Sequence, residues 1–382
     1  MIVRYEAWGA WVKLEEAAAL VALDHDAARA AGLEGGAAWS SPSAAASPPV
    51  EVHLAVTGKC AAGCEGCYLD ARPDGDEPPQ ETLLARLDTL AAQGVFTVAF
   101  GGGEPITRDD LGELALAARA RGLTPVLTTS GLGLSEARVQ RLGAFAQVNV
   151  SYDGAGEAYA SVRGFDGAKA AEAAIERLVR AGLTVGVNVV LTRQSFPHLA
   201  DTLRRARALG AREAQLLRYK PAGRAATLDY LARRLSPEQV DGFVPTLRAL
   251  AAEHGAGDGA FHVRIDCALV PFLSADPSLE AETLARLGVF GCEAGDRLAA
   301  MRVDGKSAPC SFAEPADGAE LARWRAYAAA PDEPCASCTL RPVCKGGCKV
   351  VSRFVDERHG PDPECPRVRA HRRPTPKTHH AS

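Results

Sequence analysis

The sequence Glu51-Val-His-Leu-Ala-Val-Thr57 is followed, after Gly58 and Lys59, by Cys60-Ala-Ala-Gly-Cys64-Glu-Gly-Cys67-Tyr68. The first seven residues are predicted to form a strand, and the three cysteines follow in a C-x3-C-x2-C spacing. Three thiolates can hold three irons of a [4Fe–4S] cube and leave the fourth iron free for a small molecule. The spacing differs from ferredoxin runs, so it indicates a catalytic cluster. A structural zinc site is the alternative, but zinc requires four ligands.

From the strand at 51–57 onward, predicted strands and helices alternate along the chain. We expect strands at 51–57, 96–100, 124–129, 147–152, 184–191 and 213–219, and helices at 79–93, 108–121, 135–142, 168–181 and 196–209. Such alternation implies parallel strands joined by right-handed crossovers. Six units predict an α/β fold built on a partial (β/α)6 barrel rather than on the full eight.

The remaining segments divide the chain further. Residues 1–49 are expected to form a strand pair, a helix at 24–32 and a Gly/Ala/Ser/Pro linker, and the barrel is expected to occupy 50–235. A bridging helix (237–254) and a strand follow within 236–266. Residues 267–368 are rich in Cys, Gly and Pro, and they need metal clusters as staples because they lack apolar periodicity. The tail at 369–382 is expected to be disordered.

Composition excludes several classes of function. The chain has 382 residues, of which 43 are basic and 47 acidic, and its net charge of −4 does not point to nucleic acid or an anionic membrane. No apolar run approaches the ~20 residues of a membrane helix. The first residues alternate like a strand and include an early acid, unlike a signal peptide. We therefore expect a cytoplasmic protein.

A polar cluster follows or ends each predicted barrel strand. In a parallel barrel the carboxyl ends of the strands carry the working loops, so these clusters are expected to meet on one rim. They are Cys60 to Cys67, Gly101 to Pro105, Ser130-Gly131, Ser151 to Gly154, Arg193-Gln194 and Arg218 to Pro221.

The cysteine triplet with Tyr68, together with Gly102-Gly103-Glu104-Pro105, resembles the radical S-adenosylmethionine (SAM) superfamily over roughly residues 50–225. The resemblance implies that the open iron chelates the amino and carboxylate groups of SAM. Reductive cleavage then yields methionine and a 5′-deoxyadenosyl radical, which abstracts hydrogen from the substrate.

The resemblance also implies roles for individual residues. Cys60, Cys64 and Cys67 would be the catalytic cluster ligands. The SAM contacts would be Gly102, Gly103 and Glu104 at the amino group, Tyr68 near the adenine, Ser151 at the ribose and Arg163 at the carboxylate. Ser130 stands in Thr129-Ser130-Gly131, where the family often has Thr-Asn-Gly, and its hydroxyl would replace the amide.

Simpler interpretations exist for several of these residues. The glycine run could be an ordinary strand-to-helix turn, and Arg163 could be a solvated surface residue. Arg218 and Arg224 are either rim residues that face a substrate or salt-bridge partners.

The other eight cysteines resemble the SPASM extension of radical SAM peptide and protein maturases. Cys335-x2-Cys338-x5-Cys344-x3-Cys348 with Cys365 matches one half of the motif, and Cys292 with Gly305 and Cys310 matches the other. The resemblance assigns Cys292, Cys310 and Cys348 to auxiliary cluster I, and Cys335, Cys338, Cys344 and Cys365 to auxiliary cluster II. Cys267 would complete cluster I and leave it no open iron, so that the chain carries three [4Fe–4S] clusters. The alternatives are a zinc ribbon and, for Cys267, a buried free thiol.

The resemblance predicts an enzyme that modifies a peptide or protein side chain, most often by crosslinking a genetically encoded precursor. A flavodoxin or ferredoxin would supply electrons. Residues 1–49 are too few for a complete leader-recognition domain, so a leader would be bound by a separate protein or by the barrel. The alternatives are a sulfatase-maturing (formylglycine-forming) enzyme, a processor of a quinone-cofactor precursor, and a non-catalytic metal-binding scaffold.

Overall fold

A nine-stranded sheet forms the centre of the protein. The computed structural model describes residues 1–14, 19–40, 47–255, 260–357 and 360–372. The six expected strands lie side by side in chain order and pair in parallel. They are β4 (Glu51–Thr57), β5 (Thr97–Gly102), β6 (Thr124–Thr129), β7 (Gln147–Ser151), β8 (Val185–Leu191) and β9 (Glu213–Arg218). The predicted parallel α/β fold is therefore confirmed.

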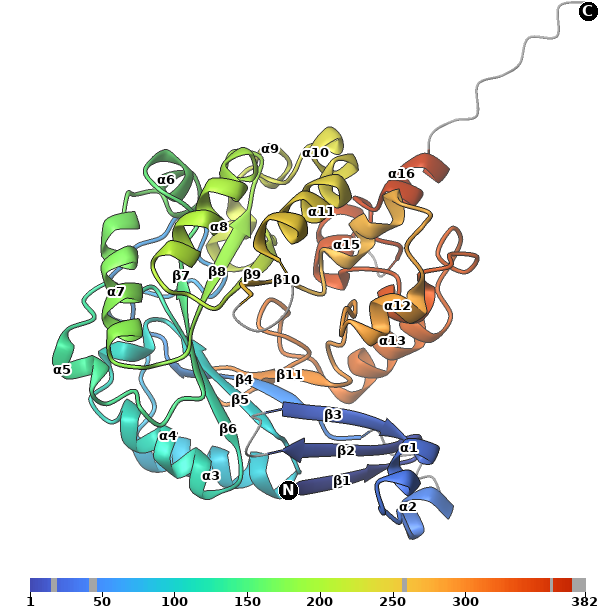
Figure 1. Ribbon diagram of the computed structural model, residues 1–382, viewed down its shortest axis with the longest axis horizontal. Coiled ribbons are helices and arrows are strands. Elements are labelled where there is room, and N and C mark those ends of the chain that lie inside the picture. The colour runs from blue at the N-terminus through green and yellow to red at the C-terminus, as the bar shows by residue number, and fades with distance from the viewer. Residues whose placement is uncertain (15–18, 41–46, 256–259, 358–359, 373–382) are drawn as a thin grey trace, which may run out of the picture.

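Helices cover the outer side of the curved sheet (Figure 1). They are α3 (Gln80–Ala92), α4 (Leu111–Ala120), α5 (Glu136–Val139), α6 (Glu157–Arg163), α7 (Ala168–Arg180) and, after a 3-10 turn at Phe196–His198, α8 (Leu199–Ala208). α7 shows why: its apolar residues recur at helical spacing, and Ala171, Ile175 and Leu178 are completely buried. Burial of each large aliphatic side chain stabilises the fold by roughly 1.5–3 kcal/mol.

The sheet is wider than the six expected strands. β10 (His262–Ile265) pairs in parallel with β9, and β11 (Leu298–Met301) pairs in parallel with β4. β12 (Ser307–Ala308) adds an antiparallel edge to β11. β11 and β12 come from the cysteine-rich region, which thereby joins the barrel sheet. Strands this short carry little periodicity, so only long-range pairing defines them.

The N-terminal segment forms three strands, not the expected pair. β1 (Ile2–Glu6), β2 (Gly9–Leu14) and β3 (Ala19–Asp24) make a separate antiparallel sheet, followed by α1 (His25–Ala30). A further short helix, α2 (Ala37–Ser40), lies where only a linker was expected, and part of that linker (41–46) is outside the described residues.

This small sheet is anchored near the amino ends of the barrel strands (Figure 1). Arg4 Nη1 donates to the carbonyl of Gly94, which precedes β5, at 2.8 Å. Lys13 Nζ donates to the carbonyl of Gly122, which precedes β6, at 2.6 Å. The N-terminal sheet therefore contacts the end of the barrel opposite the rim where the polar clusters lie.

Short helices follow β9, and most of them lie within the cysteine-rich region. They are α9 (Tyr230–Arg233), α10 (Pro237–Asp241), α11 (Phe243–His254), α12 (Ala281–Arg286), α13 (Gly318–Ala329), α14 (Arg341–Cys344), α15 (Lys349–Asp356) and α16 (Pro366–Arg372), with 3-10 turns at Gly223–Thr227 and Val270–Ala275. The expected helix at 237–254 is divided at Gly242.

The disordered tail does not begin at residue 369. α16 continues to Arg372, and its Arg369 and Arg372 form ion pairs with Asp241 and Asp356. Residues 373–382 are outside the described part of the chain.

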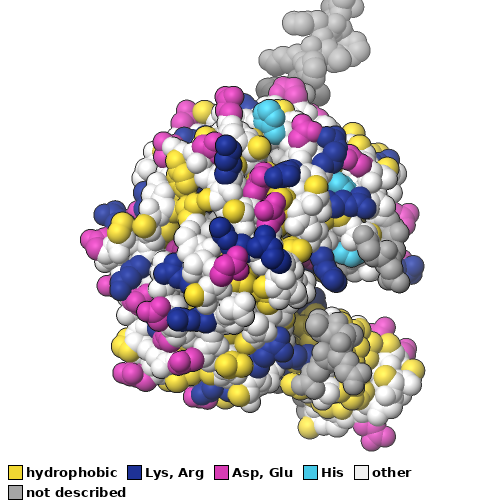
Figure 2. All heavy atoms as spheres, turned by 60° about the vertical axis from the view of Figure 1, so that its left-hand side comes forward, with side chains coloured by type: hydrophobic (Ala, Val, Ile, Leu, Met, Phe, Trp, Pro, Cys, Tyr) yellow, Lys and Arg dark blue, Asp and Glu magenta, His cyan; other side chains and the backbone are white. Residues whose placement is uncertain are grey.

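Acidic and basic side chains are interspersed over the face shown in Figure 2. None of the described helices is both long and apolar enough to cross a membrane.

Candidate active site

The loop that carries Cys60, Cys64 and Cys67 is held by the glycine run at the end of β5. Gly103 N donates to Thr57 O at 2.6 Å, and Glu104 N donates to Lys59 O at 2.7 Å. A Cβ atom at Gly103 would lie 2.1 Å from the Lys59 carbonyl oxygen. Glycine is required here because two backbones touch. The run is thus more than an ordinary strand-to-helix turn, since it positions the start of the cysteine loop.

Arg224 braces the same loop from the other side. Its guanidinium donates to Cys64 O at 2.9 Å, to Asp70 Oδ1 at 2.8 Å and to Ala71 O at 2.9 Å. Of the two alternatives for Arg224, the structure supports the salt-bridge partner. Its fork of donors spans several acceptors, which a lysine cannot do.

The three thiols of this loop lie near one another and are partly buried. Burial raises the pKa of Cys60, and Glu104, Cys64 and Cys67 raise it further. Among the residues that the structure describes, no three Cys, His, Asp or Glu side chains are close enough to hold one metal ion between them. Partly buried thiols that would repel one another as thiolates are stabilised when they bind a cationic group.

Glu104 ties together the ends of β5 and β6. Its buried carboxylate accepts hydrogen bonds from Thr129 Oγ1 at 2.6 Å and from Ser130 N at 2.8 Å, and the Ser130 hydroxyl donates to it as well. Burial raises the pKa of Glu104 even though these hydrogen bonds lower it. The Ser130 side chain is therefore engaged by Glu104, and in this structure both belong to one polar unit on the rim.

Arg163 is half-buried and ion-paired, so its interpretation as a solvated surface residue is wrong. It ends α6, and its Nε donates to the fully buried Asp153 at 2.6 Å. Asp153 is itself fixed by Val190 N at 2.7 Å. Burial lowers the pKa of Arg163, but Asp153 and then Cys64 raise it more, so it stays charged beside the Cys64 thiol. Ser151, two residues before Asp153, is buried at the end of β7.

Tyr68 links the triplet to the cysteine-rich region. Its ring packs on Phe312, with centroids 4.6 Å apart and an interplanar angle of 33°. Burial raises the pKa of Tyr68 to about 12, and the neighbouring Cys67 contributes to the increase. Phe312 lies two residues beyond Cys310, so this aromatic pair places the Cys60–Cys67 loop close to the loop that carries Cys310.

The eight remaining cysteines form two groups. Burial raises the pKa of Cys267 and of Cys310, and in both cases Cys292 and Cys348 raise it further. Burial likewise raises the pKa of Cys335 and of Cys344, and Cys365 raises both pKa values further. Cys338 also raises the pKa of Cys335, so the second group consists of Cys335, Cys338, Cys344 and Cys365. These mutual effects are consistent with the two ligand sets that the SPASM resemblance implies, with Cys267 beside Cys292 and Cys348; the assignment of the thiols to two clusters stays a prediction.

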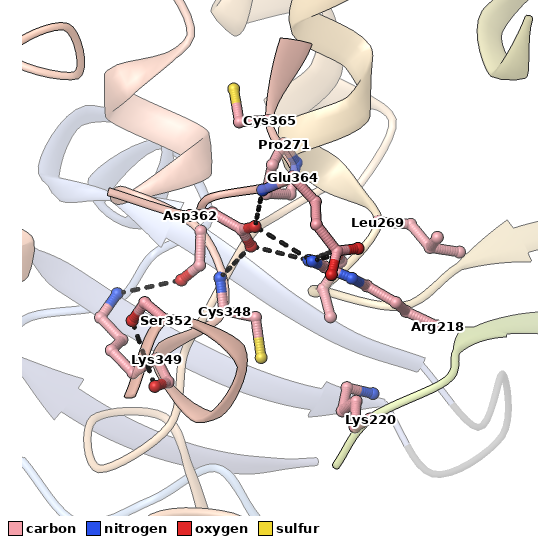
Figure 3. A network of polar contacts seen from close by, with 12 residues as sticks. Arg218, Lys220, Leu269, Pro271, Cys348, Lys349, Ser352, Asp362, Glu364 and Cys365 are labelled. Atoms are coloured by element: carbon pink, nitrogen blue, oxygen red, sulfur yellow. Dashed lines mark hydrogen bonds and ion pairs between the residues drawn. The ribbon is translucent and has the colours of Figure 1, made fainter. Parts of the chain in front are cut away.

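Arg218 is a buried salt-bridge partner and not a rim residue that faces a substrate. Figure 3 shows it at the centre of a network between β9 and the C-terminal segment. Nη1 and Nη2 contact the two oxygens of Asp362 at 2.7 and 3.0 Å, and Nη2 lies 2.8 Å from Glu364 Oε2. Asp362 Oδ2 also accepts from Cys348 N at 3.0 Å. The pair therefore joins the barrel to a cysteine of the C-terminal region.

Sequence reasoning missed several residues of the site. Asp153, Lys220, Asp266, Phe312 and Lys349 were given no role, although all but Phe312 are buried charged side chains near a cysteine group. The only signals were that Asp153 and Lys220 fall within the polar clusters at strand ends, and that Asp266 and Lys349 each adjoin a cysteine.

Comparisons with known proteins agree with this geometry. Residues 54–206 match the Radical SAM superfamily. The chain is 26% identical over 348 residues to the PqqA peptide cyclase of Granulibacter bethesdensis, covering 85% of this chain and 89% of that protein. It is 29% identical over 343 residues to the mycofactocin maturase MftC of Mycolicibacterium smegmatis, covering 83% and 82%.

Two solved structures share the fold. Streptococcus suis SuiB bound to S-adenosylmethionine superposes with a TM-score of 0.70 at 16% identity, covering 95% of this chain and 98% of that one. Native anSMEcpe with bound AdoMet and a Cp18Cys peptide superposes with a TM-score of 0.63 at 17% identity, covering 85% and 95%.

Proposed function

We propose that this chain, which belongs to the radical SAM superfamily, modifies a peptide side chain with a radical made from SAM. The family implies a [4Fe–4S] cluster and SAM. The observation that supports Cys60, Cys64 and Cys67 as the ligands is their position on one loop, which the Gly103–Glu104 backbone and Arg224 hold on the rim.

When bound, the cluster would supply an electron and SAM a sulfonium that this electron can cleave to methionine and a 5′-deoxyadenosyl radical. The residues of the chain position the reactants. Arg163, held by Asp153, offers a guanidinium beside Cys64 that suits a carboxylate. Glu104 fixes the ends of β5 and β6, where an amino group would meet backbone acceptors. The half-buried Tyr68 ring, packed on Phe312, helps to exclude water from this end of the loop.

The two four-thiol groups are proposed to hold two auxiliary [4Fe–4S] clusters, which makes three clusters in the chain. With Cys267 as the fourth ligand of the first auxiliary cluster, no iron there is open to a substrate thiolate. Electron transfer or structural support is then the role that remains for both auxiliary clusters.

The peptide substrate is inferred from relatives whose names describe a peptide cyclase and a maturase. A formylglycine-forming activity has weaker support, because neither of these two relatives is named for it. An external flavodoxin or ferredoxin, a separate leader-binding protein and the cytoplasmic location stay predictions.

Anaerobic reconstitution tests this proposal. About twelve irons per chain are expected, with a matching amount of sulfide, and reduction in the presence of SAM should release 5′-deoxyadenosine. Substitution of Cys60, Cys64 and Cys67 by alanine should leave about eight irons and abolish that release. Bound zinc in place of iron, or twelve irons without SAM cleavage, would contradict the proposal. A purified precursor peptide encoded beside the gene then tests the substrate class by mass change.

A further inference from the structure

A buried ion pair lies between β9 and the first four-thiol group. Lys220 follows β9 by two residues and is 5% exposed, and its Nζ contacts Asp266 Oδ2. Asp266 directly precedes Cys267. Its Oδ1 accepts hydrogen bonds from Ala268 N at 3.0 Å and Leu269 N at 3.1 Å, so the carboxylate cannot turn freely. The two charges are therefore fixed within the protein.

The Lys220 ammonium also lies against the loop that carries Cys310, another thiol of this group. Lys220 Nζ lies 4.1 Å from the ring centroid of Phe312, two residues beyond Cys310. Contact with an aromatic face stabilises an ammonium ion that has lost its water. Lys220 thus reaches from the strand end to the Cys310 loop.

Both charges of the ion pair act on thiols of this group. Lys220 lowers the pKa of Cys267, Cys310 and Cys348 against the larger effect of burial. For Cys267, burial is the largest effect and Asp266 the next, and both raise the pKa. The group thus has a buried cation and a buried anion beside it, and the anion directly precedes Cys267 in the chain.

Fixed charges beside a redox centre alter its reduction potential. Gaining an electron makes a thiolate-bound cluster more negative, so a nearby cation favours the reduced form and an anion disfavours it. The effect is strong where water is excluded, because the effective dielectric constant is low.

We propose that Lys220 and Asp266 set the reduction potential of the auxiliary cluster at Cys267, Cys292, Cys310 and Cys348, with Lys220 raising it and Asp266 lowering it. This inference rests on one part of the proposed function, namely that these four thiols hold an auxiliary cluster. Lys220 acts on the cluster through its charge and does not touch a reacting atom.

The second four-thiol group provides an internal comparison. Lys349 is 1% exposed, and its Nζ donates to the carbonyls of Lys345 at 2.8 Å and Gly347 at 3.3 Å. Its charge lowers the pKa of Cys344, which belongs to the second group, while burial and Cys365 raise that pKa. Each group therefore has a buried lysine of its own, and substitution of either lysine should act on one centre.

The experiment uses the full chain with Cys60, Cys64 and Cys67 replaced by alanine, so that only the auxiliary centres contribute to the spectrum. Redox titration followed by electron paramagnetic resonance gives the midpoint potential of each centre. The chain with these three alanines is the parent for this experiment. K220M should lower the midpoint potential of the first centre by about 59 mV for a one-electron couple, so that its reduced-to-oxidised ratio at the midpoint potential of the parent falls about tenfold. D266N should shift the same centre in the opposite direction, and K349M should lower the potential of the other centre alone.

Iron content separates the two levels of the proposal. A parent chain without about eight irons contradicts the proposed function, and the inference with it. With eight irons bound, unchanged potentials in K220M and D266N, or shifts of both in the same direction, overturn the inference alone. If K220M loses iron, the test passes to K220R and D266N. A potential near that of the parent in K220R, together with a raised one in D266N, supports the inference, and any other pair of results overturns it.

Discussion

Arg218 on β9 and Asp362, 144 residues later in the chain, form a two-point ion pair inside the protein, with Nη1–Oδ2 and Nη2–Oδ1 distances of 2.7 and 3.0 Å. Both side chains are at most 3% exposed. Asp362 also packs where a Cβ atom at Gly347 would lie, 2.3 Å from Asp362 Cβ. The pair, with Cys348 N on the same carboxylate, makes the barrel and the cysteine-rich region depend on each other.

Asp362→Asn should destabilise the protein by about 1.5–3 kcal/mol, because the buried Arg218 loses its two-point partner and keeps only Glu364, 2.8 Å from Nη2. Urea unfolding of the holoprotein measures the loss. Arg234→Met is the matched control: Arg234 contacts Glu364 of the same network at 3.1 Å but is 26% exposed, so its removal should cost about 1 kcal/mol or less. Equal losses in the two variants would show that the buried pair has no special weight.

Gly103→Ala should disrupt the cysteine loop, because its methyl group would meet the Lys59 carbonyl at 2.1 Å. Overpacking against backbone costs about 1–3 kcal/mol, and the iron held by the triplet should be lost first. Iron counting should give about eight instead of twelve. Gly101→Ala is the control, since no heavy atom lies within 4 Å of its added carbon, and it should stay within about 0.5 kcal/mol of the parent. Full iron content in Gly103→Ala would contradict the packing argument.

Arg224→Lys should lower the iron content and the release of 5′-deoxyadenosine, although the charge is kept. A single ammonium cannot reproduce the donors to Cys64 O, Asp70 and Ala71 O. Arg72→Lys tests the specificity of the effect, because Arg72 pairs with the same Asp70 but is 64% exposed. Normal SAM cleavage in Arg224→Lys would show that charge alone suffices at this position.

His254 should make stability depend on pH below about 6.5. Its side chain is buried against Phe261, with ring centroids 5.0 Å apart, and burial lowers its pKa from 6.5. The unfolded chain then binds a proton more readily than the folded chain, so this contribution is complete above pH 6.5 and is lost as pH falls through the lower folded pKa. The urea midpoint of the parent should fall more between pH 7.5 and 5.5 than that of His254→Phe. Parallel curves would show that His254 does not carry this dependence.

The sequence determined the barrel and which three cysteines share the loop after its first strand. Alternating strand and helix periodicity is local, so β4 and β6 were predicted with their observed bounds, and Cys60, Cys64 and Cys67 lie within one loop whose spacing is visible in the chain. The division of the other eight thiols came from their spacing and from resemblance.

Only the tertiary structure decided how charged residues are used. Arg163, Arg218 and Arg224 look alike in sequence, but each meets a partner 10 or more residues away, at Asp153, Asp362 and Cys64 respectively. The pairing of β11 with β4 and the contact of Lys220 with Asp266 are equally non-local. A buried charge is stable only where folding brings its counter-charge, and no local pattern records which distant residue that will be.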